Sequence, residues 1–201
     1  MTRASAIYRN PYLYQALMRA LYGPYYEARY RAVAVEIPEE TEVVELCAGD
    51  CRLYLKHLRS KRVRYVALDN ARPLVDWARR HGVDAREFDV ARDPIPQADV
   101  VLMQASLYQF LPDVEPVIER MLDAARQRVV IAEPVRNLTQ TLPAGIVRWA
   151  RKLTQPAGDS RYRGERFDAE TLQSLFERFD CKRSFAIPGG RERVGVFEGR
   201  A

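Results

Sequence analysis

The residues best placed to do chemistry lie in a short turn that follows an apolar run. The turn reads Glu45-Leu46-Cys47-Ala48-Gly49-Asp50-Cys51. Small residues let a ligand approach the backbone closely. A helix predicted over residues 53–58 would direct its free N–H groups and its positive dipole end toward the same place. This combination is suited to binding a carboxylate or a phosphate.

Further polar positions follow later apolar runs, in order along the chain. Asp69 and Asn70 end the second run, Asp89 and Val90 follow the third, and Gln104 ends the fourth. An acid at the end of the second strand can accept two hydrogen bonds from a ribose. A side-chain acid or a backbone group after the third strand could contact the edge of an adenine. In open α/β sheets such a ligand lies across the carboxyl ends of the strands.

The elements that must position these residues alternate between strand and helix. Apolar runs of strand type occur at 43–46, 65–68, 100–103 and 129–132, with a weaker one at 85–88. Amphipathic stretches lie at 53–58, 74–78 and 114–125. Apolar strands separated by helices are buried on both faces, which predicts a parallel α/β sheet.

The two ends of the chain follow other patterns. Residues 10–35 have helical spacing broken at Gly23 and Pro24, and they are rich in tyrosine, which is suited to a half-buried lid. Residues 167–179 predict an amphipathic helix with Asp168 as its N-cap. Residues 181–187 and 193–197, joined by a Pro-Gly-Gly turn, predict a β-hairpin.

In these features the chain resembles class I S-adenosylmethionine-dependent methyltransferases over about residues 42–200. The first loop of that family reads acid-x-Gly-x-Gly-x-Gly. Glu45 and Gly49 match the acid and the middle glycine, whereas Cys47 and Cys51 stand where the family has its first and third glycines. The resemblance implies a Rossmann-like α/β fold. Its mostly parallel, seven-stranded sheet would have the order 3-2-1-4-5-7-6, helices on both faces and a C-terminal antiparallel hairpin.

The resemblance also implies a cofactor, S-adenosylmethionine, and roles for the first loop. Glu45 would shape the loop and approach the amino group of the cofactor. The backbone of Cys47, Ala48 and Gly49 would contact the methionyl part. The side chain of Cys47, larger than a glycine, would crowd that part of the cofactor.

The later strand ends receive the remaining roles. Asp69 would hold the ribose hydroxyls, with Asn70 flanking the adenine. Asp89 and Val90 would meet the adenine edge. Gln104 would lie near the sulfonium and the methyl acceptor.

Length and composition limit the remaining choices. A chain of 201 residues favours one domain. We expect a helical lid over 1–35, a cofactor-binding core over 36–133, a lid or substrate insertion over 134–166, and a terminal helix and hairpin over 167–201. No apolar run suggests a spanning helix and the start lacks a secretory pattern, so we expect a cytoplasmic protein. Three cysteines predict neither a disulfide framework nor a zinc site, and we expect no metal.

The acceptor is less well specified. The net charge of +5 is concentrated in residues 1–31 and 136–166, while the rest of the chain is mildly acidic, which argues against a nucleic-acid partner. The amphipathic segment Ile146–Leu153 favours a small or lipid-like acceptor, and it leaves a peripheral contact with a membrane surface open. Tyr108 and Glu133 are the candidates for a catalytic base, with a packing role as the alternative for Tyr108. His57 and His81 are predicted to be surface residues.

Two other functions remain as alternatives. A nicotinamide-dependent oxidoreductase would need Gly-x-Gly-x-x-Gly after the first strand. Cys47 and Arg52 occupy two of those three positions, so this reading is weaker. A methyltransferase-like fold without turnover, serving as a binding module, is suggested by the two cysteines in the loop.

Overall fold

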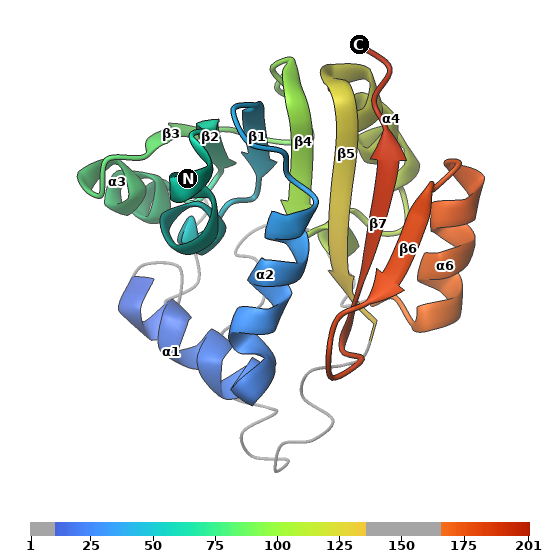
Figure 1. Ribbon diagram of the computed structural model, residues 1–201, viewed down its shortest axis with the longest axis horizontal. Coiled ribbons are helices and arrows are strands. Elements are labelled where there is room, and N and C mark those ends of the chain that lie inside the picture. Colours follow the sequence, from blue (N-terminus) through green and yellow to red (C-terminus); the bar gives the residue numbers. More distant parts are fainter. Residues whose placement is uncertain (1–10, 136–165) are drawn as a thin grey trace.

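The computed structural model describes residues 11–135 and 166–201. Its strands form one sheet of seven, in the order β3-β2-β1-β4-β5-β7-β6 (Figure 1). The predicted α/β fold and strand order are therefore confirmed. The strands are β1 (Glu42–Leu46), β2 (Arg64–Asp69), β3 (Asp84–Glu87), β4 (Ala98–Gln104), β5 (Ala125–Pro134), β6 (Arg183–Ala186) and β7 (Glu192–Glu198).

The helices cover both faces of this sheet. They are α1 (Pro11–Tyr22), α2 (Tyr26–Val35), α3 (Arg72–Arg80), α4 (Glu115–Ala124) and α6 (Ala169–Arg178). The break between α1 and α2 falls at Gly23–Tyr25, as the Gly-Pro pair predicts. Helix α6 begins with a capping box, in which Asp168 accepts from the Thr171 N–H at 2.8 Å and so confirms the predicted cap.

Strand pairing brings the predicted site residues to one edge. Strand β1 runs parallel to both β2 and β4, and β4 runs parallel to β5. The carboxyl ends of all four therefore point the same way. Strand β7 is antiparallel, so its first residue, Glu192, lies opposite Pro134 at the end of β5. Gln104, Glu133 and Glu192 thus reach the edge that also carries the loop after β1.

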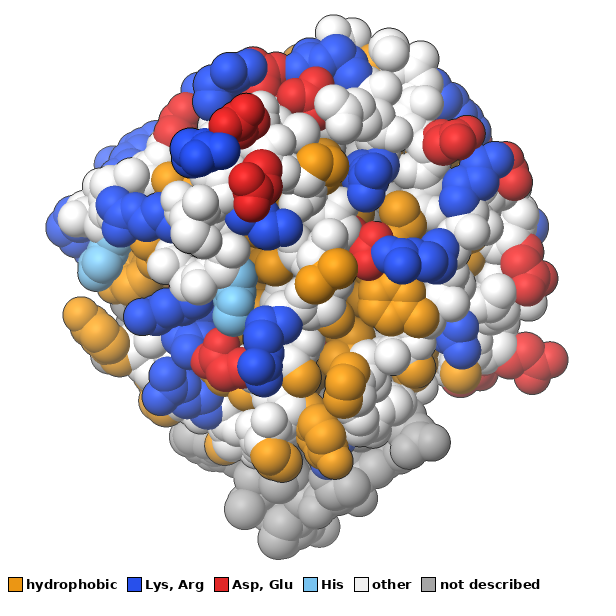
Figure 2. All heavy atoms as spheres, in the orientation of Figure 1, with side chains coloured by type: hydrophobic (Ala, Val, Ile, Leu, Met, Phe, Trp, Pro, Cys, Tyr) orange, Lys and Arg blue, Asp and Glu red, His pale blue; other side chains and the backbone are white. Residues whose placement is uncertain are grey.

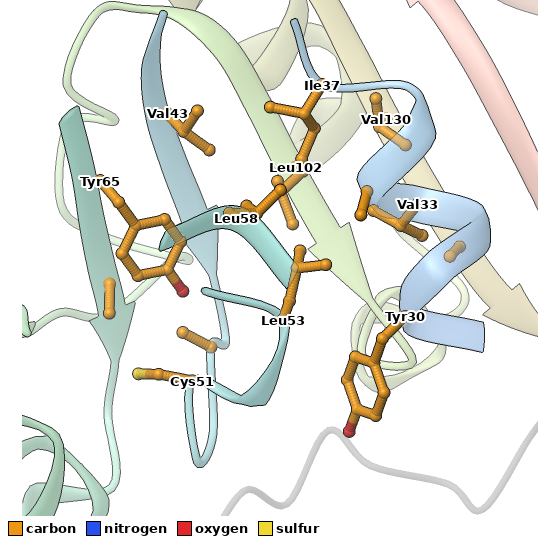
Figure 3. Close-up of a cluster of buried hydrophobic side chains, with 14 of the residues drawn as sticks. Tyr30, Val33, Ile37, Val43, Cys51, Leu53, Leu58, Tyr65, Leu102 and Val130 are labelled. Atoms are coloured by element: carbon orange, nitrogen blue, oxygen red, sulfur yellow. The ribbon is translucent and has the colours of Figure 1, made fainter. Parts of the chain in front are cut away.

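Two hydrophobic clusters fill the space on either side of the sheet. Successive strand residues face opposite sides, so Val43 belongs to one cluster and Val44 to the other. The first cluster lies under α2 and α3, and its centre is drawn in Figure 3. The second lies under α4 and α6. The sheet is thus covered on both faces, as the continuous apolar strands predict.

The segment after the first loop departs from the predicted regular helix. Residues Tyr54–Leu58 form a single wide turn of π type, and a 3₁₀ turn follows over Arg59–Lys61. The ring of Tyr54 stacks on Tyr65 with centroids 4.4 Å apart, while Leu58 is buried in the sheet-facing core. The stacking on Tyr65 holds this turn against β2.

The two N-terminal helices differ in burial: α1 exposes Tyr12 and Leu13, whereas α2 packs into the first cluster. Tyr22, Tyr26 and Tyr30 are all buried and belong to the first hydrophobic cluster. In Figure 1, α2 crosses the front of the sheet near the carboxyl ends of the central strands. Strand β5 ends at Pro134. The insertion expected over 134–166, including its amphipathic run Ile146–Leu153, lies almost entirely outside the described residues.

Charged side chains on the visible face are mixed in sign. Figure 2 shows basic and acidic groups interspersed over the upper half of the view. Some of them form ion pairs between strands, as where Arg64 and Arg126 both contact Glu42. The positively charged segment 136–166 lies, except for Arg166, outside the described residues.

Candidate functional site

The backbone of the loop after β1 has a glycine-like conformation at three alternating positions. Cys47, Gly49 and Cys51 have φ values of +54°, +59° and +50°. The turn is closed by a hydrogen bond from Cys51 N–H to Ala48 O at 2.9 Å, and Ala48 N–H donates to Leu68 O at 3.2 Å. Left-handed backbone is unfavourable for residues with a Cβ. The loop therefore keeps the path that three glycines would favour, although two of the residues are cysteines.

The two thiols lie on opposite faces of the sheet. Cys51 is buried within the first cluster, beside Tyr65 (Figure 3). Cys47 is half-buried and packs against the second cluster, near Ser106. Burial raises the pKa of both thiols well above the ordinary value. Both side chains are therefore thiols at neutral pH, and Cys51 takes its bulk into the core.

Asp69 joins the first loop to the second. One carboxylate oxygen accepts from Gly49 N–H and the other from Ala71 N–H, each at 2.8 Å. Burial raises the pKa of this carboxyl, while the two backbone bonds act in the opposite direction. An ionised carboxylate has about four acceptor positions. Asp69 can therefore organise the loops and still accept hydrogen bonds from a ligand; Asn70 beside it is exposed.

Glu45 lies beneath the loop rather than at its mouth. Its carboxyl is buried and accepts the hydroxyl of Tyr65. Burial raises the pKa of Glu45 to about 8, and Asp50 and Asp69 add to that increase. Glu45 is thus largely protonated near neutral pH. Its expected approach to a cofactor amino group needs either a bridging water or the loss of this proton.

Three buried polar groups at the same edge have unused hydrogen-bonding capacity. Asp50 Oδ2, both amide atoms of Gln104 and Glu133 Oε1 have no hydrogen-bond partner among the described residues. Buried polar atoms without partners are rare, and each calls for an explanation such as a bound ligand. These groups come from the first loop, the end of β4 and the end of β5, where a ligand across the strand ends would lie.

The two candidate bases are neighbours across the turn after β4. Glu133 is wholly buried, and its Oε2 accepts from Leu107 N–H at 2.9 Å. Burial raises its pKa to about 8. Tyr108, in the short helix that Glu133 caps, is half-buried, and the Arg166 guanidinium lies 3.7 Å from its ring centroid. Glu133 therefore has a structural contact as well as an unpaired oxygen.

The loop after β3 is organised by Asp89 itself. Asp89 Oδ1 accepts from Ala91 N–H at 3.0 Å, and Asp89 N–H donates to Asp93 Oδ2 at 2.8 Å. The side chain of Val90 is buried in the second cluster. The guanidinium of Arg120 donates to two carbonyls of this loop. Sequence reasoning missed Arg120, because an arginine in a helix is usually a solvated residue.

A buried ion pair near the site was also missed. Arg29 on α2 donates to Glu192 on β7 through Nε, at 3.0 and 3.1 Å. Tyr22 donates its hydroxyl to the same carboxylate, and the Arg29 guanidinium lies over the rings of Tyr22 and Tyr30. The two partners are far apart in the sequence, and no local pattern links them. The pair fixes α2 against the edge that carries the site.

Both histidines make structural contacts. His57 Nε2 lies 3.2 Å from Glu27 Oε2, and its ring stacks on Tyr30. His81 is exposed and stacks on Trp77. Within residues 11–135 and 166–201, no group of three or more His, Cys, Asp or Glu could hold a metal ion. Over the same ranges, no helix has the length and apolarity needed to cross a bilayer.

Comparison with known proteins places the fold. No protein-family model matches the chain, and no curated protein matches its sequence. A chain in the Haloferax volcanii complex of the methyltransferase activator Trm112 with a methyltransferase matches at TM-score 0.70 and 11% identity, over 100% of both chains. An S-adenosylmethionine-dependent methyltransferase from Thermotoga maritima matches at 0.67 and 16%, over 96% of this chain and 98% of the other.

A third solved structure also has a similar fold. The magnesium protoporphyrin IX methyltransferase of Synechocystis, with bound S-adenosylhomocysteine, matches at TM-score 0.61 and 12% identity, over 90% of this chain and 92% of the other. Identities this low establish the fold alone. Together with the strand order, they show that this chain has the Rossmann-like fold of class I S-adenosylmethionine-dependent methyltransferases.

Proposed function

We propose that the protein binds S-adenosylmethionine and transfers its methyl group to a small or lipid-like acceptor. One observation carries this proposal. The loop after β1 keeps three left-handed residues, and its Gly49 N–H is bonded to the acid that ends β2. That link aligns two loops at the carboxyl edge of the sheet, where ligands of open α/β sheets lie.

The residues at this edge fit the proposed cofactor. The N–H groups of Ala48 and Gly49 are already bonded within the fold, so the loop would meet the methionyl part through the other backbone groups of Cys47, Ala48 and Gly49. Asp69 has acceptor positions left for the two ribose hydroxyls. Asp50 Oδ2 can accept a hydrogen bond from a ligand; burial raises the pKa of this carboxyl, and Arg52 acts in the opposite direction. Asn70, Asp89 and Val90 would surround the adenine, and Glu45 would support the loop from below.

The cofactor, when bound, supplies an electrophilic methyl group on a cationic sulfur. The protein then has to hold the acceptor in line with that methyl group and exclude water, which is mainly a gain in orientation. Gln104 is buried with both amide atoms unpaired, so it can orient a polar group of the acceptor. Glu133 and Tyr108 are the proposed groups for removing a proton from the acceptor. Burial raises the pKa of Glu133 to about 8, so this carboxyl is mostly protonated near neutral pH and would act as a base above about pH 8.

The nature of the acceptor is proposed from the sequence pattern around the site. On the tyrosine-rich helices, Tyr12 and Tyr25 are exposed, whereas Tyr22, Tyr26 and Tyr30 are buried in the first cluster. Such rings combine apolar area with a polar tip, which suits a small molecule or a lipid-like one.

Calorimetric titration with S-adenosylmethionine, S-adenosylhomocysteine and NADH tests the proposal. We expect heat with the first two. Asp69→Ala should weaken their binding roughly 5- to 150-fold, because charge-assisted hydrogen bonds are lost. Asp84→Ala is the matched control, because Asp84 is exposed and bonds Arg86 on the same strand. Urea unfolding of both variants separates a lost contact from a lost fold.

Two results would redirect the proposal. Tighter binding of NADH would favour an oxidoreductase. No heat with any of the three ligands would favour a binding module without turnover, the alternative that Cys47 and Cys51 suggest. Cys47→Gly distinguishes these readings further, because removing the thiol from an active loop should keep or strengthen affinity for S-adenosylhomocysteine.

A further inference from the structure

The loop over residues 89–93 is shaped by hydrogen bonds within it and is held at one point by the buried Val90 side chain. Asp89 and Asp93 bond each other through Asp89 N–H to Asp93 Oδ2 and Asp93 N–H to Asp89 O, both at 2.8 Å. These bonds shape the turn but do not anchor it. Phe88 N–H, just before it, donates to Asp69 O at 3.0 Å, and the Val90 side chain packs in the second cluster.

Arg120 supplies the anchor from another element. It lies on α4, and its Nη1 donates to Val90 O while its Nη2 donates to Asp93 O. The two carbonyls stand near the two ends of the turn, so one planar guanidinium spans it. Only arginine presents two donors in such a fixed fork. Helix α4 itself is secured in the core by buried residues such as Ile118 and Met121.

We propose that Arg120 is a positioning residue that holds loop 89–93 against α4 and thereby sets the preference of the site for an adenine base. This inference rests on the proposed function, in which Asp89 and Val90 face the adenine. Arg120 acts through the loop carbonyls, and it needs no contact with the cofactor.

The selectivity follows from hydrogen-bond matching. Adenine presents an amino group where hypoxanthine presents a carbonyl, so only adenine can donate there to an acceptor on the loop. A matched acceptor discriminates only when it is held in place. When the two donors of Arg120 are removed, the carbonyls bond water and the turn gains freedom. Affinity for the adenine ligand should then fall toward that for the hypoxanthine ligand.

The experiment compares S-adenosylhomocysteine with S-inosylhomocysteine in titrations of four proteins. These are the wild type, Arg120→Met, Arg120→Lys and the control Arg178→Met. Arg178 lies on α6, and its replacement removes a surface ion pair with Glu115 on α4, the helix that carries Arg120. We expect Arg120→Met to reduce the preference for the adenine ligand about fivefold or more, the size of one lost hydrogen bond. Arg120→Lys should give an intermediate loss, and the control should keep the wild-type ratio.

Amide hydrogen exchange of residues 89–93 in the ligand-free proteins gives a second readout. Exchange there should be about tenfold faster in Arg120→Met than in the control, because a local anchor is gone. Unchanged exchange would overturn the inference, as would an equal loss of affinity for both ligands. If the wild type binds neither ligand, the proposed function fails and the selectivity claim fails with it. Faster exchange together with a reduced ratio supports the inference.

Discussion

Replacing Glu45 by glutamine should stabilise the protein near neutral pH. The Glu45 carboxyl is buried at the end of β1 and accepts the Tyr65 hydroxyl. Burial raises its pKa from 4.5 to about 8. Glutamine has nearly the same shape, its carbonyl can accept the same hydroxyl, and it has no proton to lose. The substitution therefore isolates the free energy that this one titration contributes to folding.

The size of the effect follows from proton linkage. Below its ordinary pKa of 4.5, Glu45 is protonated in both the folded and the unfolded chain. Between 4.5 and about 8 the folded protein keeps a proton that the unfolded chain has released, so the free energy of unfolding falls as pH rises. The slope is about 1.4 kcal/mol per pH unit, which amounts to on the order of 3 kcal/mol by about pH 7. Glu45→Gln should escape this loss.

Urea unfolding at acidic, neutral and alkaline pH measures the difference. We expect Glu45→Gln to match the wild type in acid and to exceed it by on the order of 3 kcal/mol near neutral pH. The gain should grow to on the order of 5 kcal/mol by about pH 8 and stay constant above it. Glu87→Gln, on the exposed strand β3, is the control and should follow the wild-type curve. The pKa of Glu133 is raised in the same way, so its titration changes the free energy of unfolding equally in all three proteins. Parallel curves for Glu45→Gln and the wild type would refute the reasoning.

Three other substitutions test the packing by urea or thermal unfolding. Arg29→Met leaves Glu192 buried without its cation and should lower the free energy of unfolding by about 3–5 kcal/mol; a loss below 1 kcal/mol, roughly that of an exposed pair, would contradict the buried tie. Gly195→Ala places a Cβ 2.7 Å from the Phe176 ring and should cost about 1–3 kcal/mol; no loss would mean that the ring moves freely. Asp168→Ala removes the cap of α6 and should cost about 1 kcal/mol, with no change expected in ligand binding.

Much of the fold was predictable because its strands and helices follow from local sequence patterns. Apolar runs set the strands, the Gly23 break separated α1 from α2, and Asp168 marked the start of α6. Right-handed connections between parallel strands then leave few strand orders. The wide turn over Tyr54–Leu58 was not predictable, because it depends on stacking against Tyr65, which a periodicity cannot register.

The candidate site was predictable only where it follows strand ends. The ends of β1, β2 and β4 must meet at one edge, so the proximity of Gly49 and Asp69 could be inferred from their positions. The assignment of ligand contacts to these residues remains a prediction. Arg29 and Arg120 could not be found, because each works through a contact with a distant segment, and the arginine-rich composition gave no reason to single them out.

The placement of Cys47 and Cys51 on opposite sides of the sheet has a practical consequence. A pair of cysteines four positions apart suggests a dithiol that could close under oxidising conditions and shut the loop. Here Cys51 packs inside the first cluster and Cys47 packs against the second, and burial raises the pKa of both thiols. Peroxide or glutathione disulfide should therefore form no disulfide between Cys47 and Cys51.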